Sequence, residues 1–237
     1  MNQPFKFKKF TVAQDRCAMK IGTDGVLLGA WTSIKHTPFS ILDIGAGTGI
    51  IALQLAQRSN AELIDAIEID ENAYEQCVDN FENAAWGDRL FCYHASLDEF
   101  VDEIEDKYDL IVSNPPFYSE DYKTTSEARD LARFNEALPF DELITSVSRL
   151  LSDEGIFSVI IPKKEEENFI KMAAKVNLFP KRICSVRGTE TSEIKRSMLE
   201  FSFTETTVDL ENLTLEISRH KYTEDYKKLV ADFYLKM

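Results

Sequence analysis

Short apolar runs alternate with amphipathic stretches from Phe39 to the end of the chain. Apolar runs of about 4–8 residues are typical of buried strands, and apolar residues at every third or fourth position are typical of helices. Strands are predicted at 40–44, 63–69, 90–94, 110–112, 156–161, 181–186 and 198–203, with 212–217 as a further candidate. Helices are predicted at 48–58, 70–81, 97–104, 140–151, 165–176 and 222–234. This alternation predicts an α/β fold with a seven-stranded, mostly parallel sheet covered by helices on both faces.

The predicted boundary within the chain lies at residue 37, between an N-terminal extension (1–37) and one α/β domain (38–237). With 237 residues, 44% of them hydrophobic, the chain is long enough for one large core. No run approaches the ~18 apolar residues that span a bilayer, and the first residues lack the apolar run of a secretory signal. The cysteines are widely spaced, with no pair at metal-ligand spacing: Cys17, Cys77, Cys92 and Cys184. We therefore expect a cytoplasmic protein with reduced thiols, no membrane segment and no metal site.

The net charge of −14 disfavours indiscriminate binding to nucleic acid. The charge is uneven, however: residues 1–37 and 163–196 each carry +4, whereas 38–162 carry −19 and 197–237 carry −3. Two basic segments on an acidic chain permit a localised anion-binding face without requiring one.

A glycine-rich turn, Asp43-Ile-Gly45-Ala-Gly47-Thr-Gly49, follows the first predicted strand. Glycine lets backbone approach a ligand closely, but this spacing differs from the G-x-G-x-x-G of a dinucleotide pyrophosphate turn. The acidic residue before the turn also disfavours a diphosphate and favours a cationic ligand. Glu68, at the end of the second strand, is placed to accept hydrogen bonds from both hydroxyls of a ribose. Together these features predict a site for S-adenosylmethionine, although a glycine cluster alone is equally typical of a tight strand-to-helix turn. Asp70 is expected to cap the following helix.

The segment Asn114-Pro115-Pro116-Phe117 ends the fourth predicted strand. In doubly wound sheets, ligands bind beyond the carboxyl ends of the strands, where this segment is expected. The Asn114 side-chain oxygen and the Pro115 carbonyl can accept both N–H hydrogens of an amine conjugated to a ring, and Phe117 offers a face for stacking a planar base. These acceptors favour a nucleophilic nitrogen aimed at a methyl donor. The alternative is a proline turn that merely stops the strand.

These motifs resemble the class I S-adenosylmethionine-dependent methyltransferases that act on amino nitrogens. The stretches FKKFTVAQDRCAMKIGTDGVLLGAW (7–31), RDLARFNEALPFDEL (129–143) and YTEDYKKLVADFYLKM (222–237) extend the resemblance, over essentially the whole chain, to the bacterial tRNA1(Val) (adenine(37)-N6)-methyltransferases. The resemblance implies a Rossmann-like class I methyltransferase fold and methyl transfer to N6 of an adenosine beside the anticodon of tRNA. It also implies that the extension 1–37 packs over the cofactor.

The resemblance assigns roles to individual residues. Asp43, Gly45, Gly47 and Gly49 surround the methionine end, Glu68 holds the ribose, and Asn114–Phe117 hold the target base. After the third strand, related enzymes often have an acidic residue that contacts the cofactor adenine. This chain has Ser96 at that position, and Asp98 is assigned to the following helix. Lys20 and Thr23 lie in the region that folds over the cofactor, and Lys20 is a candidate for the methionine carboxylate; a short structural helix over 21–28 is the alternative. The predicted cofactor site further includes Ala46, Ile69, Leu97 and Asn114.

An RNA substrate requires cations that contact phosphate, because extruding a base from a folded anticodon arm costs a few kcal/mol. The candidates are Arg129, Arg133, Lys163, Arg187, Lys195 and Arg196, with Lys6, Lys8, Lys9 and Lys164 as weaker ones. A single lysine or arginine is more often a solvated surface residue than an RNA contact, and that is the alternative for each of them. The expected partner is the anticodon stem-loop of tRNA, and a monomer is expected.

Three alternatives remain open from the sequence. An Asn-Pro-Pro-aromatic segment also suits N2 of a ribosomal guanine or the amide of a protein glutamine. A non-catalytic RNA-binding module is an alternative of another class, disfavoured by the joint presence of Asp43, Glu68 and Asn114. A nicotinamide oxidoreductase is disfavoured by the glycine spacing.

Overall fold

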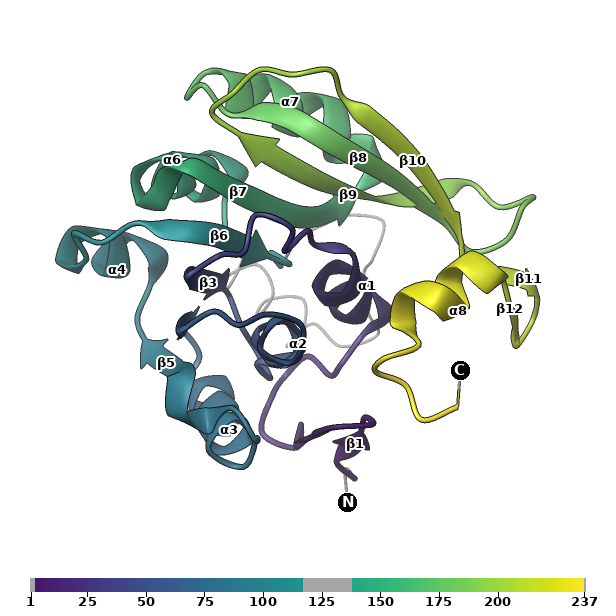
Figure 1. Ribbon diagram of the computed structural model, residues 1–237, viewed down its shortest axis with the longest axis horizontal. Coiled ribbons are helices and arrows are strands. Elements are labelled where there is room, and N and C mark those ends of the chain that lie inside the picture. The colour runs from purple at the N-terminus through teal and green to yellow at the C-terminus, as the bar shows by residue number, and fades with distance from the viewer. Residues whose placement is uncertain (1–2, 117–137, 237) are drawn as a thin grey trace, which may run out of the picture.

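A computed structural model describes residues 3–116 and 138–236, which are built around one eight-stranded sheet (Figure 1). The strand order is β10 (Asp209–Thr214), β8 (Phe179–Arg187), β9 (Ile194–Ser202), β7 (Leu151–Pro162), β6 (Tyr108–Ser113), β3 (Ser40–Ile44), β4 (Leu63–Glu68) and β5 (Leu90–His94). Only β9 runs antiparallel to its neighbours in this sheet. The predicted mostly parallel α/β fold is confirmed. The predicted count of seven strands is one too low, because the further candidate becomes β10 and pairs with β8.

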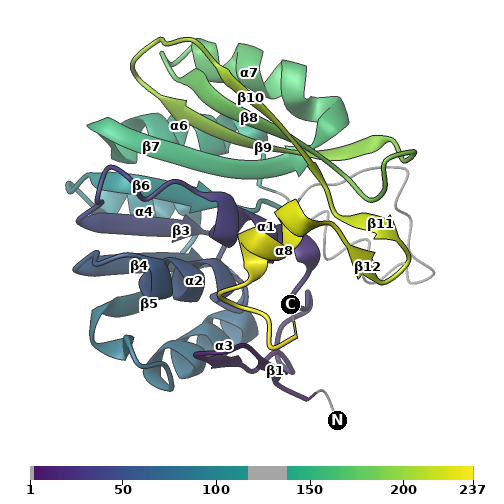
Figure 2. The ribbon, with the colours of Figure 1, turned by 45° about the vertical axis from the view of Figure 1, so that its right-hand side comes forward.

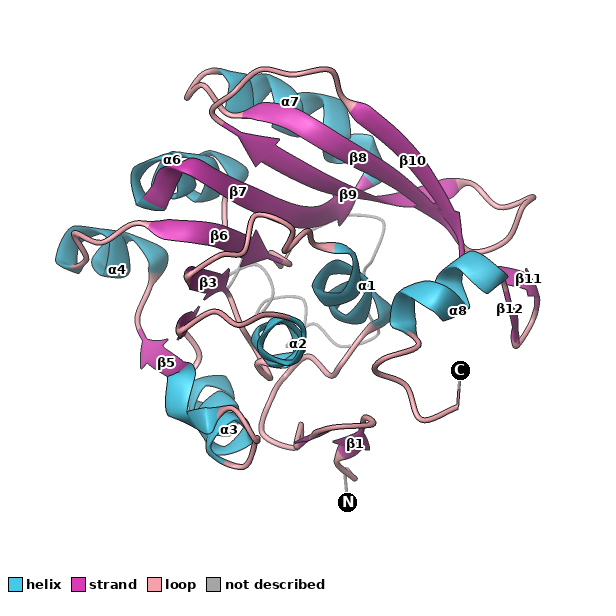
Figure 3. Cartoon of the chain, viewed as in Figure 1, coloured by secondary structure: helices cyan, strands magenta, loops and turns pink. Residues whose placement is uncertain are grey.

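Helices cover both faces of the sheet (Figures 2 and 3). One face carries α1 (Thr23–Trp31), α2 (Ile50–Arg58), α3 (Glu71–Glu82) and α8 (Glu224–Val230), whose buried side chains form one core cluster. The other face carries α4 (Leu97–Glu103), α6 (Phe140–Leu150) and α7 (Glu166–Ala174), which form a second cluster. Two short 3-10 turns, Gly87–Arg89 and Lys163–Glu165, follow α3 and β7 respectively. The sheet therefore separates two cores, as two-faced burial of apolar strands requires.

Most predicted elements have somewhat different bounds in the structure: the strand predicted over 156–161 spans Leu151–Pro162, and that over 198–203 spans Ile194–Ser202. Two elements near the end of the chain differ in another way. The predicted helix over 222–234 begins only at Glu224, because Tyr222 belongs to a hairpin of β11 (Glu216–Ser218) and β12 (Lys221–Tyr222). Thr223 then caps α8 by accepting a hydrogen bond from the Tyr226 N–H. The predicted strand over 212–217 is divided in the same way, between β10 and β11.

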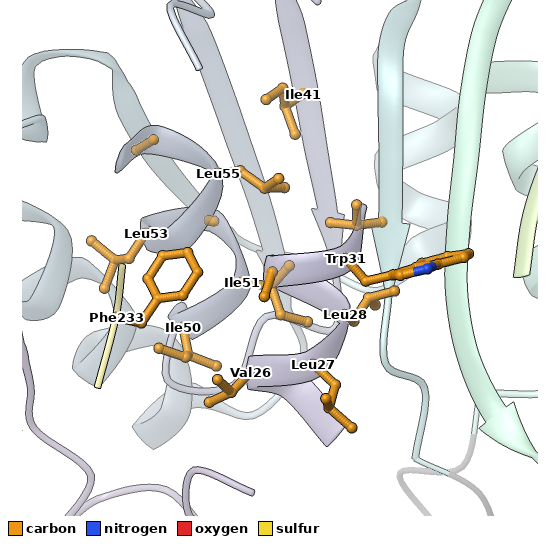
Figure 4. Packing of buried hydrophobic residues seen from close by; sticks show 14 of the residues in the cluster. Val26, Leu27, Leu28, Trp31, Ile41, Ile50, Ile51, Leu53, Leu55 and Phe233 are labelled. Carbon is orange, nitrogen blue, oxygen red and sulfur yellow. The ribbon is translucent and has the colours of Figure 1, made fainter. Parts of the chain in front are cut away.

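The helix α1 is buried along most of its length against α2. Figure 4 shows Val26 of α1 beside Ile50 and Ile51 of α2, with Phe233 next to Leu53 and with the Trp31 ring pointing away from α2. This packing makes the second half of the predicted N-terminal extension part of the first core cluster.

Three charged side chains join the end of α1 to the C-terminal strands. The Arg182 guanidinium lies 4.1 Å from the centre of the Trp31 ring and pairs with Glu211 at 2.7 Å and with Glu200 at 3.4 Å. Trp31 Nε1 donates to Glu211 at 2.7 Å, and Glu200 accepts from the Ser33 N–H at 2.7 Å. Because only 4% of the Glu200 side chain is exposed, its charge depends on these partners.

Both ends of the described chain meet beside α2. A small hairpin of β1 (Phe5–Lys6) and β2 (Thr11–Val12) lies next to the residues that follow α8 (Figure 2). Phe7 forms a β-bridge with Tyr234, and the Lys8 N–H donates to the Phe233 carbonyl at 2.8 Å. The Lys8 ammonium donates to the Ala231 carbonyl at 2.5 Å.

The four cysteines are free, and Cys17, Cys77 and Cys184 are buried, so the prediction of unpaired thiols is confirmed. No helix within 3–116 and 138–236 combines the length and apolar character needed to cross a membrane.

Candidate active site

A pocket of about 350 Å³ opens at the carboxyl edge of the sheet, where β3, β4 and β6 end. Its lining comes from the turn after β3 (Gly45, Gly47), the end of β4 (Glu68, Ile69), the start of α4 (Ser96, Leu97, Asp98) and the residues after β6 (Asn114, Pro116). Residues 17–19 and the start of α6 complete the lining. The volume and position are those of a site for a small ligand in a doubly wound sheet.

The three glycines of the turn serve two different purposes. All three have positive φ angles, of 73° at Gly45, 55° at Gly47 and 76° at Gly49. Open space surrounds the position of a Cβ at Gly45 and Gly47, and both line the pocket, so their backbone is accessible to a ligand. A Cβ at Gly49 would lie 2.5 Å from the Phe81 ring and 2.8 Å from the Cys77 sulfur. Gly49 therefore lets α2 approach α3 and does not line the pocket.

Asp43 lies beneath the glycine turn and is fully buried. Its Oδ2 accepts a hydrogen bond from the Ala52 N–H at 3.1 Å, whereas Oδ1 has no hydrogen-bond partner among the described residues. Burial, with a smaller contribution from the negative charge of Glu68, raises the pKa of Asp43 to about 7. An unpartnered carboxylate oxygen below the turn fits a cationic ligand, because positive charge there compensates its lost solvation.

Glu68 is held at the pocket by two backbone donors. Its Oε2 accepts from the Gly47 N–H at 2.7 Å, and its Oε1 accepts from the Asp70 N–H at 3.0 Å. Each carboxylate oxygen has a second lone pair, so both can still accept from the hydroxyls of a ribose. Asp70 caps α3 by accepting from the Ala73 N–H at 2.8 Å, which confirms the predicted cap.

Ser96 lines the pocket, but its hydroxyl is engaged within the chain. It caps α4, donating to Glu99 at 2.7 Å and accepting from the Glu99 N–H at 3.4 Å in a capping box. Asp98 also lines the pocket, and hydrogen bonding by Ser96 lowers the pKa of its carboxyl. Glu142 of α6 faces the same region, and burial together with the charge of Asp98 raises its pKa.

Asn114 and Pro116 line the pocket directly after β6, and Pro115 between them is buried. The end of β6 is joined to β3 by the Ser113 hydroxyl, which donates to the Ile44 carbonyl at 2.9 Å. The helix α1 lies behind Asn114, because a Cβ at Gly25 would be 4.0 Å from Asn114 Nδ2. The predicted stacking residue Phe117 lies outside the described residues.

The pocket gathers most of the residues predicted for a cofactor, but not all of them. Those that line it are Gly45, Gly47, Glu68, Ile69, Ser96, Leu97 and Asn114. Those placed elsewhere are Asp43, Ala46 and Gly49 in or beneath the turn, and Lys20 and Thr23 before or at the start of α1. The sequence prediction missed the remaining lining residues: Cys17, Ala18, Met19, Ile44, Ile67, Asp70, Ala73, Ala95, Asp98, Leu138, Pro139 and Glu142.

The residues just before 17–19 are fastened to α3. The Ala13 N–H donates to the Asn80 side chain at 2.8 Å, and Asn80 Nδ2 donates back to the Ala13 carbonyl at 2.9 Å. The Arg16 N–H donates to Gln76 at 3.1 Å. Buried Gln76 and Asn80 on a helix are the sequence signal for this attachment, because buried amides need partners.

Three of the basic residues predicted to contact RNA are paired with carboxylates. Lys163 pairs with Glu166 at 2.7 Å, Arg196 pairs with Asp24 at 2.8 Å, and Arg187 pairs with Glu190. Lys195 is exposed. Arg129 and Arg133 lie outside the described residues. Within the described part of the chain, no three His, Cys, Asp or Glu side chains are grouped to hold a metal ion.

The strand order, the glycine turn over Asp43, Glu68 at the end of β4 and the Asn-Pro-Pro segment after β6 are those of a class I methyltransferase. A family model described as the methyltransferase small domain matches residues 26–169. A structure described as a predicted O-methyltransferase from Agrobacterium tumefaciens has a TM-score of 0.68 at 17% identity, with 89% of this chain and 96% of that chain covered. The TYW2 structure from M. jannaschii in complex with AdoMet has a TM-score of 0.56 at 14% identity, with 84% of each chain covered. These two likenesses concern the fold.

Curated relatives specify the family. A tRNA1(Val) (adenine(37)-N6)-methyltransferase from Christiangramia forsetii is 64% identical, with 100% of this chain and 99% of the relative covered. One from Bacteroides fragilis is 43% identical, with both chains covered completely. The chain belongs to the tRNA1(Val) (adenine(37)-N6)-methyltransferase family. The predicted family, methyltransferase activity and S-adenosylmethionine cofactor are thereby confirmed.

Proposed function

We propose that the chain methylates N6 of the adenosine at position 37 in tRNA1(Val), a tRNA modification carried out by a monomer in the cytoplasm. The observation that carries this proposal is the convergence of Asn114 and Pro116 with Glu68 and the glycine turn on one pocket. The acceptor segment and the cofactor residues therefore share one cavity. The acceptor is inferred from relatives that cover 98–100% of this chain and are named tRNA1(Val) (adenine(37)-N6)-methyltransferases.

The cofactor half of the pocket has a separate surface for each part of S-adenosylmethionine. The open backbone at Gly45 and Gly47 receives the methionine end, with Asp43 below supplying negative charge. Glu68 receives the ribose hydroxyls. Ile69 and Leu97 provide apolar contacts for the adenine, and Ser96 lies next to the polar edge of the adenine. When bound, the cofactor supplies an electrophilic methyl group on a sulfonium.

The N-terminal extension covers this site in our proposal. Cys17, Ala18 and Met19 line the pocket, and the backbone at Ala13 and Arg16 is fixed to α3 by two buried amides. The cover is therefore held in place by hydrogen bonds to the domain it covers. Lys20 and Thr23 continue from this cover into α1.

Catalysis requires an amine whose lone pair is available for attack. In our proposal the Asn114 side-chain oxygen and the Pro115 carbonyl accept the two N–H hydrogens of the adenine amino group. These hydrogen bonds favour a nitrogen with its lone pair directed at the methyl group. Pro116 shapes the wall beside the base, and Phe117 is proposed to stack on it. No strong base is needed, because the alkylated nitrogen is acidic and releases its proton to water.

The acceptor in this proposal is the anticodon stem-loop of tRNA. The target base leaves its stack at a cost of a few kcal/mol, which contacts elsewhere on the RNA offset. Lys163, Arg187, Lys195 and Arg196 are the proposed contacts among the described residues, with Arg129 and Arg133 between the Asn-Pro-Pro segment and α6.

The test is incubation of the purified chain with labelled S-adenosylmethionine and bulk tRNA from a strain that lacks the protein. Nucleoside mass spectrometry then identifies the product. N6-methyladenosine confined to a valine tRNA supports the proposal. Label found only in ribosomal RNA or protein overturns the acceptor and leaves the cofactor assignment standing.

The catalytic assignment is tested with Asn114→Ala. We expect loss of methylation while the Kd for S-adenosylmethionine stays within about tenfold, or about 1.4 kcal/mol. The matched control is Asn83→Ala, which removes an exposed amide that bonds the Asp79 carbonyl at the end of α3. Full turnover by Asn114→Ala would remove the proposed role of this side chain.

A further inference from the structure

The carboxyl edge of the sheet continues well beyond the pocket. The register pairs Pro162 at the end of β7 with Arg196 near the start of β9, and Arg187 at the end of β8 with Ile194. The last residue of β10, Thr214, also pairs with Arg187. Because all of these positions lie at the edge where β6 ends, the hairpin of β11 and β12 that follows β10 projects from the same edge as Asn114. Figure 2 shows this hairpin beyond the ends of β8 and β10, beside α8.

Main-chain hydrogen bonds fix the orientation of the hairpin. The Leu215 N–H donates to the Arg187 carbonyl at 3.0 Å, and the Glu216 N–H donates to the Gly188 carbonyl at 2.8 Å. Thr223, directly after the hairpin, donates to the Thr214 carbonyl at 2.5 Å through its hydroxyl. The hairpin is therefore an extension of the β8–β10 pairing, with a defined position relative to the sheet.

The turn of this hairpin presents basic side chains that form no ion pair with the described residues, although the His220 backbone N–H donates to the Glu216 carboxylate at 3.2 Å. Arg219, His220 and Lys221 are all exposed. Within residues 3–116 and 138–236, neither Arg219 nor Lys221 forms an ion pair, and the same holds for exposed Lys195 on β9. A phosphate can bind such a cation without first displacing a carboxylate. This availability distinguishes them from the ion-paired lysine and arginines on the same edge.

Apolar side chains accompany these cations. Ile217 on β11 is 71% exposed, and Ile194 at the start of β9 is 37% exposed. Both belong to strands at the same edge, so apolar and cationic groups lie together there. Ribose and base surfaces are partly apolar, and this combination therefore fits RNA better than a free anion.

The separation from the pocket also fits an RNA stem. Four strand spacings of about 4.8 Å separate β6 from β10, which gives about 19 Å across the sheet. A nucleic acid strand carries a phosphate roughly every 3.4 Å along its axis. A stem whose loop base enters the pocket therefore presents about five to six phosphates per strand over this distance.

We infer that Arg219 and Lys221, with Lys195 at the same edge of the sheet, bind phosphates of the anticodon stem while the target base occupies the pocket. This inference rests on the proposed function, because it names the surface that holds the same tRNA. The net charge of −14 disfavours contact with RNA over most of the surface, so a local group of unpaired cations is the part of the surface suited to phosphate.

The test compares two double variants with the same change in charge. Arg219→Glu with Lys221→Glu alters the hairpin, whereas Lys35→Glu with Lys107→Glu alters exposed lysines near the starts of β3 and β6, at the opposite edge. Kd and KM for tRNA, kcat and the Kd for S-adenosylmethionine are measured for each variant, with tRNA binding repeated over a series of salt concentrations.

We expect the hairpin variant to raise KM and Kd for tRNA at least tenfold and to reduce the slope of log affinity against log salt by roughly 1.4–1.8, the value for two lost phosphate contacts. Its kcat and its Kd for S-adenosylmethionine should stay within twofold of wild type. Arg219→Lys with Lys221→Arg should restore tRNA binding, which a purely structural defect of the hairpin would not explain.

Equal tRNA binding by the hairpin variant and the control overturns this inference while the wild type still methylates tRNA. A wild type that binds S-adenosylmethionine but methylates no tRNA overturns the proposed function, and this inference with it. The two failures are therefore distinguished by the wild-type reaction alone.

Discussion

The carboxylate of Glu68 accepts a hydrogen bond of 2.7 Å from the backbone N–H of Gly47, which joins the end of β4 to the turn after β3. The same side chain accepts from the Asp70 N–H, at the start of the next helix. One carboxylate therefore fixes two of the loops that form the cofactor half of the pocket. Its charge and its acceptor-only character are both needed for this arrangement.

Replacing Glu68 with Gln is expected to weaken cofactor binding at least tenfold, or about 1.4 kcal/mol. An amide can still accept from Gly47, but its NH2 group then faces the Asp70 N–H, and one acceptor for the ribose is lost. Isothermal titration with S-adenosylmethionine measures the change. Glu71→Gln, an exposed neighbour in the first turn of α3, is the matched control. Equal affinities for the two variants would contradict the role assigned to Glu68.

Alanine at Gly49 is expected to lower the free energy of unfolding by about 2–4 kcal/mol, because it adds overpacking against Phe81 and Cys77 to the cost of a left-handed backbone. Alanine at Gly47 meets no such contact and should cost only about 1–2 kcal/mol. Its methyl group should instead weaken cofactor binding. Urea unfolding measures the loss of stability of each variant, and titration measures its affinity for the cofactor. Equal losses of stability in the two variants would contradict the packing role assigned to Gly49.

The raised pKa of Asp43 predicts a specific pH dependence of stability. Since its pKa rises from 3.8 in a solvated chain to about 7 in the fold, the folded state binds the proton more tightly. Its stabilising contribution is complete below about pH 4 and is lost as the pH rises through 7. Relative to wild type, Asp43→Asn should therefore gain about 2 kcal/mol of stability between pH 5 and pH 7. Urea unfolding across this range is the measurement, and parallel pH curves for the two proteins would exclude the titration of Asp43.

The same titration predicts how cofactor affinity responds to pH. A cationic ligand favours the ionised carboxylate, so affinity for S-adenosylmethionine should rise with pH through 7. Asp43→Asn should show a weaker rise over the same range. Titrations at pH 6 and pH 8 measure both slopes, and a slope unchanged by the substitution would place the titrating group elsewhere.

Removal of Arg182 is expected to destabilise the fold by about 3–5 kcal/mol, because Arg182→Ala leaves the buried carboxylate of Glu200 without its cation. The control is Arg149→Ala, whose partner Asp102 lies 3.4 Å away with 75% of its side chain exposed. That variant should change stability by no more than about 0.5 kcal/mol. Thermal or urea unfolding ranks the two, and similar losses would show that the network around Trp31 does not depend on Arg182.

Much of the site could be predicted because its chemistry lies at strand ends. Gly45, Glu68 and Asn114 each follow an apolar run, and the carboxyl ends of parallel strands share one edge of a sheet. Local sequence patterns therefore predicted both which residues line the pocket and that they lie close together at one edge of the sheet. The eighth strand lay among the candidates, but its pairing with β8 depends on a neighbour about 27 residues earlier, as Leu210 opposite Ile183 shows.

The remaining site residues reach the pocket through packing that no local pattern reveals. Glu142 lies at the pocket because α6 packs against α4. Met19 lies there because Asn80 and Gln76 bind the backbone that precedes it. Charge counted by segment likewise does not show which charges pair in the fold. Arg196 lies in a basic segment but pairs with Asp24, 172 residues away.

The contacts between the ends of the described chain have a consequence for synthesis. The Lys8 side chain bonds to the Ala231 carbonyl, 223 residues later. At roughly 5–20 residues per second, a ribosome needs about 10–45 s to cover that interval. During that time the N-terminal segment can pack only on earlier residues such as Trp86, whose ring lies 6.2 Å from that of Phe10, and it lacks its contacts with Phe233 and Tyr234. The first segment of the chain to be made is therefore among the last to complete its packing.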